Sequence, residues 1–304
     1  MESLQETKPS TFDFRFKNPR EFKFPEGKVK VVDILPDQLS DGTAIVVAPG
    51  WSENYATYKD TLKFLSSSGR RSLSFEFFPN GKADKDSEFP GIELQKAKLL
   101  LDALEEKGLE RVDVIAHSEG AINVLIAAMI DPSRFRNIVL DKPAGLIGED
   151  SKIGLISRFM KLMKQETQLR PWLSTDPNAA LTAGTRVTAY LAEHPLRVMK
   201  ELDALTSYEI TDLMQDLHEK GIMFSVISGV DDPLFPVSKQ IENMRKLKET
   251  GRVLPIEGFY SVRDHDQKRD YGHNALSLRP EKHTALALNA LDNLQEKRES
   301  QKAI

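Results

Sequence analysis

Cysteine is absent from this chain of 304 residues. Its absence excludes disulfides, thiolate metal sites and a cysteine nucleophile. Three motifs are absent as well: the phosphate-binding Gly-x-x-x-x-Gly-Lys-Ser/Thr, the dinucleotide-binding Gly-x-Gly-x-x-Gly and the zinc-binding His-Glu-x-x-His. We therefore expect no metal and no organic cofactor.

An excess of positive charge and long apolar runs are also missing. The formal net charge is -4, so no basic surface for a nucleic acid is expected. The longest apolar run, residues 121–130, is far shorter than the roughly 20 residues that span a bilayer, and "MESLQETKPSTFDF" at the N-terminus lacks the apolar core of a signal peptide. We expect no transmembrane segment and a cytoplasmic location, while nothing in the sequence indicates the oligomeric state.

The sequence does contain short apolar, β-rich segments that alternate with segments of helical periodicity. This alternation predicts a mostly parallel sheet with helices on both faces. Residues 1–10 are expected to be disordered, and residues 11–18 and 28–35 alternate like a pair of strands at one sheet edge. Buried strands are predicted at 43–50, 70–78, 112–116, 136–145, 222–228 and 252–259.

Between residues 146 and 205 the pattern contains no strand, and helical periodicity dominates. In the stretch "IGLISRFMKLMKQ", Ile156, Met160 and Met163 share one helical stripe. Thr206 and Glu209 have the spacing of a capping box, which predicts a helix start and a return to the alternation. We therefore divide the chain into a core, 11–145 and 206–304, and a helical insertion, 146–205.

Ser118 follows the predicted strand "VDVIA" at the point where a helix begins. Ala116 and Gly120 on either side are small, as a sharp strand-to-helix turn requires because its two backbones lie close together. On such a turn Ser118 lies near the positive end of the helix dipole, and the amide of Glu119 points to where an oxyanion would form. The alternative is an ordinary serine N-cap beside a glycine.

A serine hydroxyl becomes a nucleophile only with a base that a carboxylate orients. His265 and His273 lie in one long loop after the last predicted strand, and both remain candidates for the base. Asp231 and Asp232 directly follow a strand in "VISGVDDPLFP", although a plain turn has the same composition. The other histidines are set aside: His117 is expected to point away across the turn, and His194, His218 and His283 lie in helical patterns.

Together these segments resemble the α/β-hydrolase superfamily over residues 12–294. The chain order Ser, Asp, His is the order of that fold. "SGVDDPLFP" is similar to the family's acid loop Gly-x-x-Asp-x-x-x-Pro, which aligns with Gly229 and Pro236 and selects Asp232. "DYGHNAL" is similar to its Gly-His segment and selects His273.

"VVAPGWSEN" resembles the family's segment after the third strand, in which the residue after the glycine lends an amide to the oxyanion hole. That residue is Trp51 here. The sequence departs from the family pattern at Pro49, where a histidine is usual, and at Ala116, where the turn usually has its first glycine. Neither departure removes a reacting group.

The resemblance implies an α/β-hydrolase fold in which residues 146–205 form a helical cap. It also implies acyl transfer to Ser118, with Asp232 and His273 completing a triad and the amides of Trp51 and Glu119 forming the oxyanion hole. No metal or cofactor is required, and the expected partner is a small-molecule acyl substrate, such as a carboxylic ester, thioester or lactone. The alternatives are carbon-carbon bond hydrolysis, cofactor-free peroxidase chemistry, and a non-catalytic receptor or scaffold on this fold.

Overall fold

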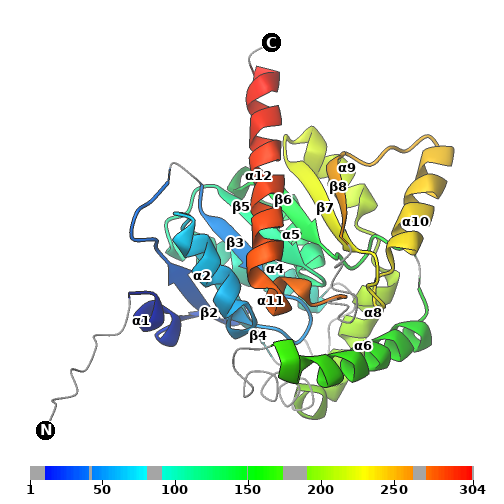
Figure 1. Ribbon diagram of the computed structural model, residues 1–304, viewed down its shortest axis with the longest axis horizontal. Coiled ribbons are helices and arrows are strands. Elements are labelled where there is room, and N and C mark those ends of the chain that lie inside the picture. Colours follow the sequence, from blue (N-terminus) through cyan, green and yellow to red (C-terminus); the bar gives the residue numbers. More distant parts are fainter. Residues whose placement is uncertain are drawn as a thin grey trace, which may run out of the picture.

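The computed structural model describes residues 11–40, 43–80, 91–148, 150–173, 190–262 and 272–302, with the backbone alone for 165–173. Residues 1–10, which the sequence predicts to be disordered, lie outside these ranges. The described residues form an eight-stranded sheet in the order β1-β2-β4-β3-β5-β6-β7-β8 (Figure 1). The strands are β1 (Arg20–Phe24), β2 (Gly27–Ile34), β3 (Ile45–Ala48), β4 (Ser72–Pro79), β5 (Val112–His117), β6 (Phe135–Asp141), β7 (Met223–Gly229) and β8 (Ile256–Val262).

Most of this sheet is parallel, as the sequence predicts. Every neighbouring pair from β4 through β8 is parallel, whereas β2 is antiparallel to both β1 and β4. Every residue of β3, β5 and β7 is buried. These strands are covered on both faces, which is why they are nearly continuous apolar runs in the sequence.

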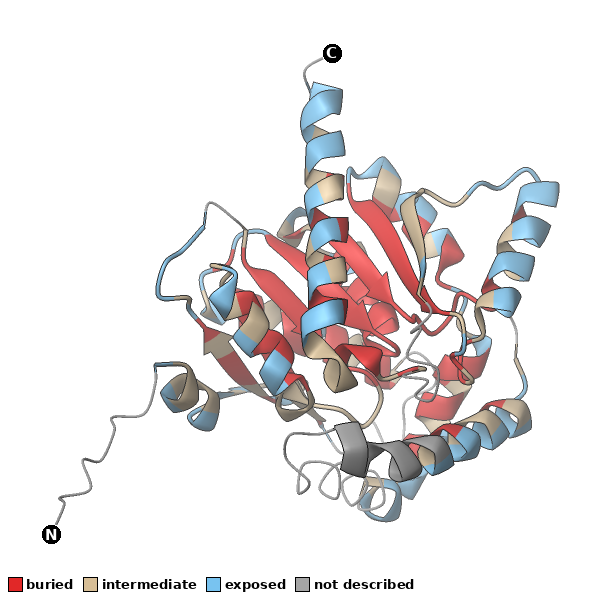
Figure 2. Ribbon diagram, in the orientation of Figure 1, coloured by how far each residue is buried: buried red, intermediate tan, exposed pale blue. Residues whose placement is uncertain are grey.

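Helices cover both faces of the sheet, with buried residues on the sides that face it and exposed residues on the outer sides (Figures 1 and 2). On one face α4, α5 and α9 bury Leu100, Leu125 and Met214 in the larger core cluster. On the other face α2 and α12 bury Leu62 and Leu291 in a second cluster. The helices of this core are α2 (Lys59–Ser67), α4 (Gly91–Glu106), α5 (Gly120–Ile130), α9 (Thr211–Glu219), α10 (Val237–Glu249), α11 (Ala275–Leu278) and α12 (Pro280–Lys302), with short 3-10 helices η1 (Tyr55–Tyr58) and η2 (Pro132–Arg134).

The strand predicted at residues 11–18 is wrong, because Thr11–Lys17 forms helix α1. Aromatic residues at every second position fit a strand, but residues four apart also share one face of a helix. The rings of Phe12 and Phe16 stack with centroids 5.8 Å apart, and Phe14 between them is 60% exposed. The antiparallel edge is formed instead by β1 and β2, of which β2 was expected.

Two helices, α6 (Lys152–Leu173) and α8 (Pro195–Ser207), lie along the edge where the parallel strands end (Figure 1). Arg197 Nη2 on α8 donates to the carbonyl of Pro79 at the end of β4, at 3.4 Å. Arg158 Nε on α6 donates to the carbonyl of Leu234, five residues after β7, at 3.1 Å. Both helices contribute side chains to the larger core cluster. Among the described helices, none is both long and apolar enough to cross a membrane.

The predicted capping box at Thr206 is wrong. Thr206 lies inside α8, where its Oγ1 donates to the carbonyl of Leu202 at 2.8 Å, and α9 begins only at Thr211. A threonine can bond the carbonyl four residues earlier in a helix as readily as it caps the next one, so the spacing alone did not decide between the two. The division into a core and an insertion at residues 146–205 stays a prediction.

Candidate active site

Ser118 lies on a sharp turn between β5 and α5. Its φ is 54°, in the left-handed region that a non-glycine residue adopts only under strain. Two backbone hydrogen bonds hold this conformation, from the Ser118 amide to the Asp141 carbonyl and from the Ala144 amide to the Ser118 carbonyl, each at 3.1 Å. A Cβ at Gly120 would lie 2.7 Å from the carbonyl oxygen of Ala48, so the turn admits only glycine there.

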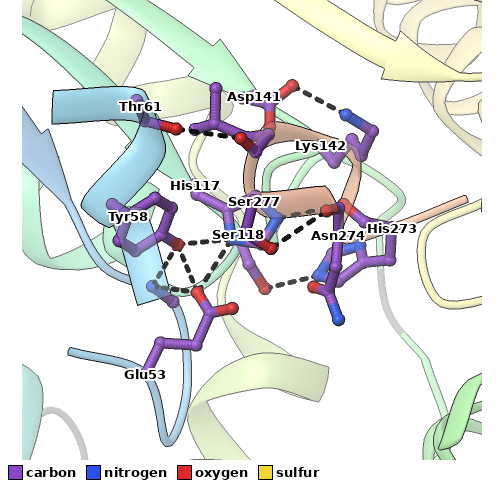
Figure 3. Close-up of polar contacts among 12 residues, drawn as sticks. Glu53, Tyr58, Thr61, His117, Ser118, Asp141, Lys142, His273, Asn274 and Ser277 are labelled. Atoms are coloured by element: carbon purple, nitrogen blue, oxygen red, sulfur yellow. Dashed lines mark hydrogen bonds and ion pairs between the residues drawn. The ribbon is translucent and has the colours of Figure 1, made fainter. Parts of the chain in front are cut away.

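The hydroxyl of Ser118 faces His273 (Figure 3). Its Oγ lies 2.9 Å from His273 Nε2, and His273 Nδ1 lies 2.9 Å from Asp232 Oδ2. The other carboxylate oxygen, Oδ1, accepts from the amides of Leu234 at 2.8 Å and Phe235 at 3.2 Å. The structure therefore brings Ser118, His273 and Asp232 into one continuous row of hydrogen bonds, with exposed fractions of 4%, 3% and 2%.

The Asp232 carboxylate is ionised in this row. Burial alone would raise its pKa, but the charge and hydrogen bond of His273, together with two backbone amides, lower the pKa below its ordinary value. An ionised carboxylate at Nδ1 keeps the proton on that nitrogen. Nε2 is then free to accept the proton of the Ser118 hydroxyl.

The other candidates from the sequence are placed differently. Asp231 is exposed, whereas Asp232 is buried. His265 lies outside the described residues. His117 does not simply point away, because its Nε2 lies 3.1 Å from the carbonyl oxygen of His273. It thus contacts the backbone of the candidate base rather than the serine hydroxyl.

The amides of Trp51 and Glu119 come from the two turns that meet at Ser118. Trp51 follows Gly50 in the loop after β3, and a Cβ at Gly50 would lie only 3.0 Å from the Ser118 Cβ. Glu119 directly follows Ser118 and precedes the first residue of α5. No backbone carbonyl of the described residues accepts from either amide. Both amides can therefore donate to negative charge that develops next to Ser118, although their role stays a prediction.

Comparison with known proteins gives a match at the level of fold. No family model and no curated protein match the chain. A serine hydrolase from the bacterium Cycloclasticus zankles is similar in structure, with a TM-score of 0.63 and 17% identity over 91% of this chain and 98% of that chain. An esterase from Exiguobacterium antarcticum has a TM-score of 0.63 and 14% identity, over 90% and 98% of the two chains. A bromoperoxidase from Bacillus anthracis has a TM-score of 0.64 and 13% identity, over 90% and 100%.

The chain has the α/β-hydrolase fold. The expected fold is thereby confirmed, and at such low identity the likeness extends no further than the fold. Ligands of open α/β sheets bind beyond the carboxyl ends of the strands. Ser118, Asp232 and His273 all lie at this edge, after β5, β7 and β8.

Two buried polar clusters flank Ser118 within this α/β-hydrolase fold, and the sequence analysis identified neither. The first, the His117 cluster, consists of Glu53, Tyr58 and His117 (Figure 3). Glu53 Oε2 accepts from Tyr58 Oη and, at 3.0 Å each, from His117 Nδ1 and the Gly50 amide. Because both ring nitrogens of His117 face oxygen acceptors, the ring is held as an imidazolium.

Each charge in the His117 cluster stabilises the other. Burial alone would lower the pKa of His117, but the Glu53 carboxylate raises it above its ordinary value. Burial alone would raise the pKa of Glu53, but His117, Tyr58 and the Gly50 amide lower it to about 2. Both shifts favour the charged forms, a Glu53 carboxylate beside a His117 imidazolium.

The second, the Lys96 cluster, consists of Trp51, Lys96, Glu119, Tyr190 and Glu201. Lys96 Nζ on α4 donates to Glu119 Oε1 at 2.6 Å and to Glu201 Oε1 at 2.8 Å. Glu201 on α8 also accepts from the indole Nε1 of Trp51 at 2.6 Å and from Tyr190 Oη, 2.7 Å from each carboxylate oxygen. Burial alone would lower the pKa of Lys96, but the two carboxylates raise it well above its ordinary value, so Lys96 carries its charge.

A metal site is not apparent in the part of the chain that the structure describes. There, no three side chains of His, Cys, Asp or Glu are grouped so that they could hold an ion. The acidic residues next to Ser118 are each engaged by a lysine or a histidine, as above.

Proposed function

We propose that this protein is a serine hydrolase that cleaves a carboxylic ester, thioester or lactone of a small-molecule acyl substrate through an acyl-Ser118 intermediate. The observation that carries the proposal is the row of hydrogen bonds from Ser118 Oγ through His273 to Asp232. In this row the serine hydroxyl faces a base whose opposite nitrogen is held by an ionised carboxylate. A receptor or scaffold on the same fold has no need of this arrangement.

In the proposed reaction, His273 Nε2 accepts the hydroxyl proton while Ser118 Oγ attacks the substrate carbonyl carbon. The amides of Trp51 and Glu119 donate to the oxyanion that forms. His273 then gives the proton to the leaving alcohol or thiol, which departs and leaves the acyl group on Ser118. A water molecule gives a proton to His273 and attacks the acyl carbonyl. The bond between the acyl carbon and Ser118 Oγ then breaks, His273 returns the proton to Oγ, and the carboxylic acid is released.

Labelling with a fluorophosphonate tests this proposal. Ser118 should react far faster than the other serines, because the base His273 and the proposed donors, the amides of Trp51 and Glu119, converge on its hydroxyl. Mass mapping should place the adduct in the peptide containing "VIAHSEGAINV". Ser118→Ala should lose labelling and aryl-ester hydrolysis together, with little change in melting temperature because the substitution removes a single hydroxyl and keeps the Cβ of the turn.

Three outcomes contradict the proposal. A folded wild-type protein that is neither labelled nor active on any ester favours a receptor or scaffold. Hydrolysis that survives in Ser118→Ala moves the active site elsewhere. Labelling at Ser118 without turnover of esters, thioesters or lactones directs attention to carbon-carbon bond or peroxide chemistry.

A further inference from the structure

The two residues whose amides form the proposed oxyanion hole are joined by their own side chains. Glu119 binds Lys96 at 2.6 Å, Lys96 binds Glu201 at 2.8 Å, and Glu201 binds the Trp51 indole at 2.6 Å. The path leads from the turn after β5, through α4 and α8, to the loop after β3. β3 and β5 are neighbours in the sheet, and this path adds a second, side-chain connection between the turns that follow them.

We propose that Lys96 and Glu201 are positioning residues that hold the amides of Trp51 and Glu119 at the correct separation for a tetrahedral oxyanion. This inference rests on the proposed function and assigns to the same site two residues that contact neither substrate nor the reacting atoms. Oxyanion donors act only within about 2.7–3.1 Å of the oxygen, so a small displacement of either turn weakens catalysis.

Burial makes this connection stiff. Lys96 is 7% exposed and Glu201 is 0% exposed. In such surroundings the charge-assisted bonds are short and little screened by water. The indole of Trp51 is held further by edge contacts with Phe159 on α6, at 5.2 Å between centroids, and with Tyr190, at 6.3 Å. These contacts with the helices over the carboxyl edge hold the Trp51 side chain, and through it the position of the Trp51 amide.

A purely structural role is the competing explanation. Buried ion pairs are weak evidence for stability, because apolar residues of similar volume often replace them without loss. The location of this network argues for the positioning role, since both of its ends are residues next to the reacting serine. A helix α4 needs no carboxylate from α8 to pack on the sheet, as its buried leucines show.

The test compares Lys96→Met and Glu201→Gln with the wild type. For each protein, kcat and KM are measured with an aryl ester, and the inhibition constant is measured with an aryl boronic acid. In the boronate adduct, Ser118 Oγ bonds to boron, the hydroxyl proton passes to His273 and the tetrahedral oxygen occupies the oxyanion hole. Each variant should lose about 10- to 100-fold in kcat and a similar factor in boronate affinity, with KM changed by less than about 3-fold.

Lys107→Met is the matched control. Lys107 lies just beyond the end of α4 and pairs with Asp33 at 3.1 Å, and its side chain is 9% exposed, as is that of Lys96. Asp33 keeps its ion pair with Arg71 at 3.0 Å in this variant, so the melting temperature should fall less than in Lys96→Met, while kcat and boronate affinity stay at the wild-type values. Trp51→Phe, which keeps the amide and removes the indole donor, should reproduce the kcat loss of Glu201→Gln even if Lys96→Met does not fold.

The outcomes separate the two proposals. If the wild type hydrolyses esters and the folded variants keep kcat and boronate affinity within about 2-fold, Lys96 and Glu201 are structural and the inference is wrong while the function stands. A rise in KM alone, with kcat and boronate affinity unchanged, also overturns it. If the wild type neither hydrolyses esters nor forms the boronate adduct, the proposed function fails and the inference fails with it.

Discussion

The two buried clusters beside Ser118 differ in the parts of the fold that they connect. The His117 cluster joins the loop after β3 and the end of β5 to the backbone of His273, all within the α/β core. The Lys96 cluster joins that same loop to α8, which lies over the carboxyl edge of the sheet. One cluster therefore ties the candidate base to the sheet, and the other ties the candidate oxyanion hole to the overlying helices.

The clusters also differ in their balance of charge. In the His117 cluster one carboxylate faces one imidazolium. In the Lys96 cluster two carboxylates share a single ammonium group, and a third carboxyl, Glu93, is buried nearby. Excess buried negative charge is costly. Removal of the cation from the His117 cluster should therefore lower the free energy of unfolding, whereas removal of an acid from the surroundings of Lys96 should raise it.

The largest effect on rate is expected at Asp232, which belongs to neither cluster. Its loss of kcat is the reference for the smaller effects expected at the clusters. Asp232→Asn removes the charge that holds the proton on His273 Nδ1, so kcat should fall by about 10⁴-fold, as in other triads. Asp231→Asn, at the exposed neighbouring position, should change kcat by less than about 3-fold. Steady-state kinetics on the two variants checks this, and the opposite ranking would assign the acid wrongly.

The largest loss of stability is expected at His117. His117→Gln leaves the Glu53 carboxylate, with a side chain 16% exposed, without its counter-charge. The free energy of unfolding should fall by about 3 kcal/mol at pH 6. Urea denaturation measures the loss, and adding Glu53→Gln in the same chain should recover part of it. A loss in the double variant equal to the sum of the two single losses would mean that the pair is not coupled.

The destabilisation caused by His117→Gln should also depend on pH. The pKa of His117 is raised in the folded state, so its stabilising contribution is complete below the unfolded pKa of about 6.5 and is lost as the pH rises through the folded pKa. The difference in unfolding free energy between the wild type and His117→Gln should therefore be largest below pH 6.5 and shrink in alkaline solution. A difference that grows with pH contradicts the imidazolium assignment.

The clusters also show which features of the site cannot be predicted from the sequence. The parallel sheet and its helices follow from local patterns, and this part of the prediction is confirmed. The resemblance selected His273 and Asp232, and the structure places both in contact, while their catalytic roles stay predictions. By contrast, Lys96 and Glu201 are 105 positions apart and belong to no motif. In the sequence Lys96 cannot be told from Lys98, yet their side chains are 9% and 45% exposed.

Errors in the predicted elements have a common physical cause. At Thr11–Lys17 the aromatic spacing satisfied both a strand and a helix, and contacts with Tyr55, far along the chain, favour the helix. At Thr206 the hydroxyl had two possible backbone partners, and the packing of α8 favours the one inside the helix. In each case tertiary contacts decided between local structures of similar energy. Glu93, beside the Lys96 cluster, does have a local signal, because it is an acid among the apolar positions of α4.

A gain in stability, similar in size to the loss at His117, is expected at Glu93, and it tests the excess of acid around Lys96. Glu93 is 2% exposed, and burial, with the nearby Glu119 and Glu201 carboxylates acting in the same direction, raises its pKa to about 7. A carboxyl whose pKa is higher in the folded protein binds more protons there than in the unfolded chain, so the wild type loses stability as the pH rises from about 4.5 to 7.

Glu93→Gln keeps the shape of the side chain and removes its ionisation. It should match the wild type near pH 4 and exceed its unfolding free energy by about 3 kcal/mol at pH 8. Denaturation curves at the two pH values check this, and Glu106→Gln, at an exposed position of the same helix, is the control. Equal stabilities of Glu93→Gln and the wild type at pH 8 would mean that Glu93 is ionised at no cost, and the contrast in charge between the two clusters would then be lost.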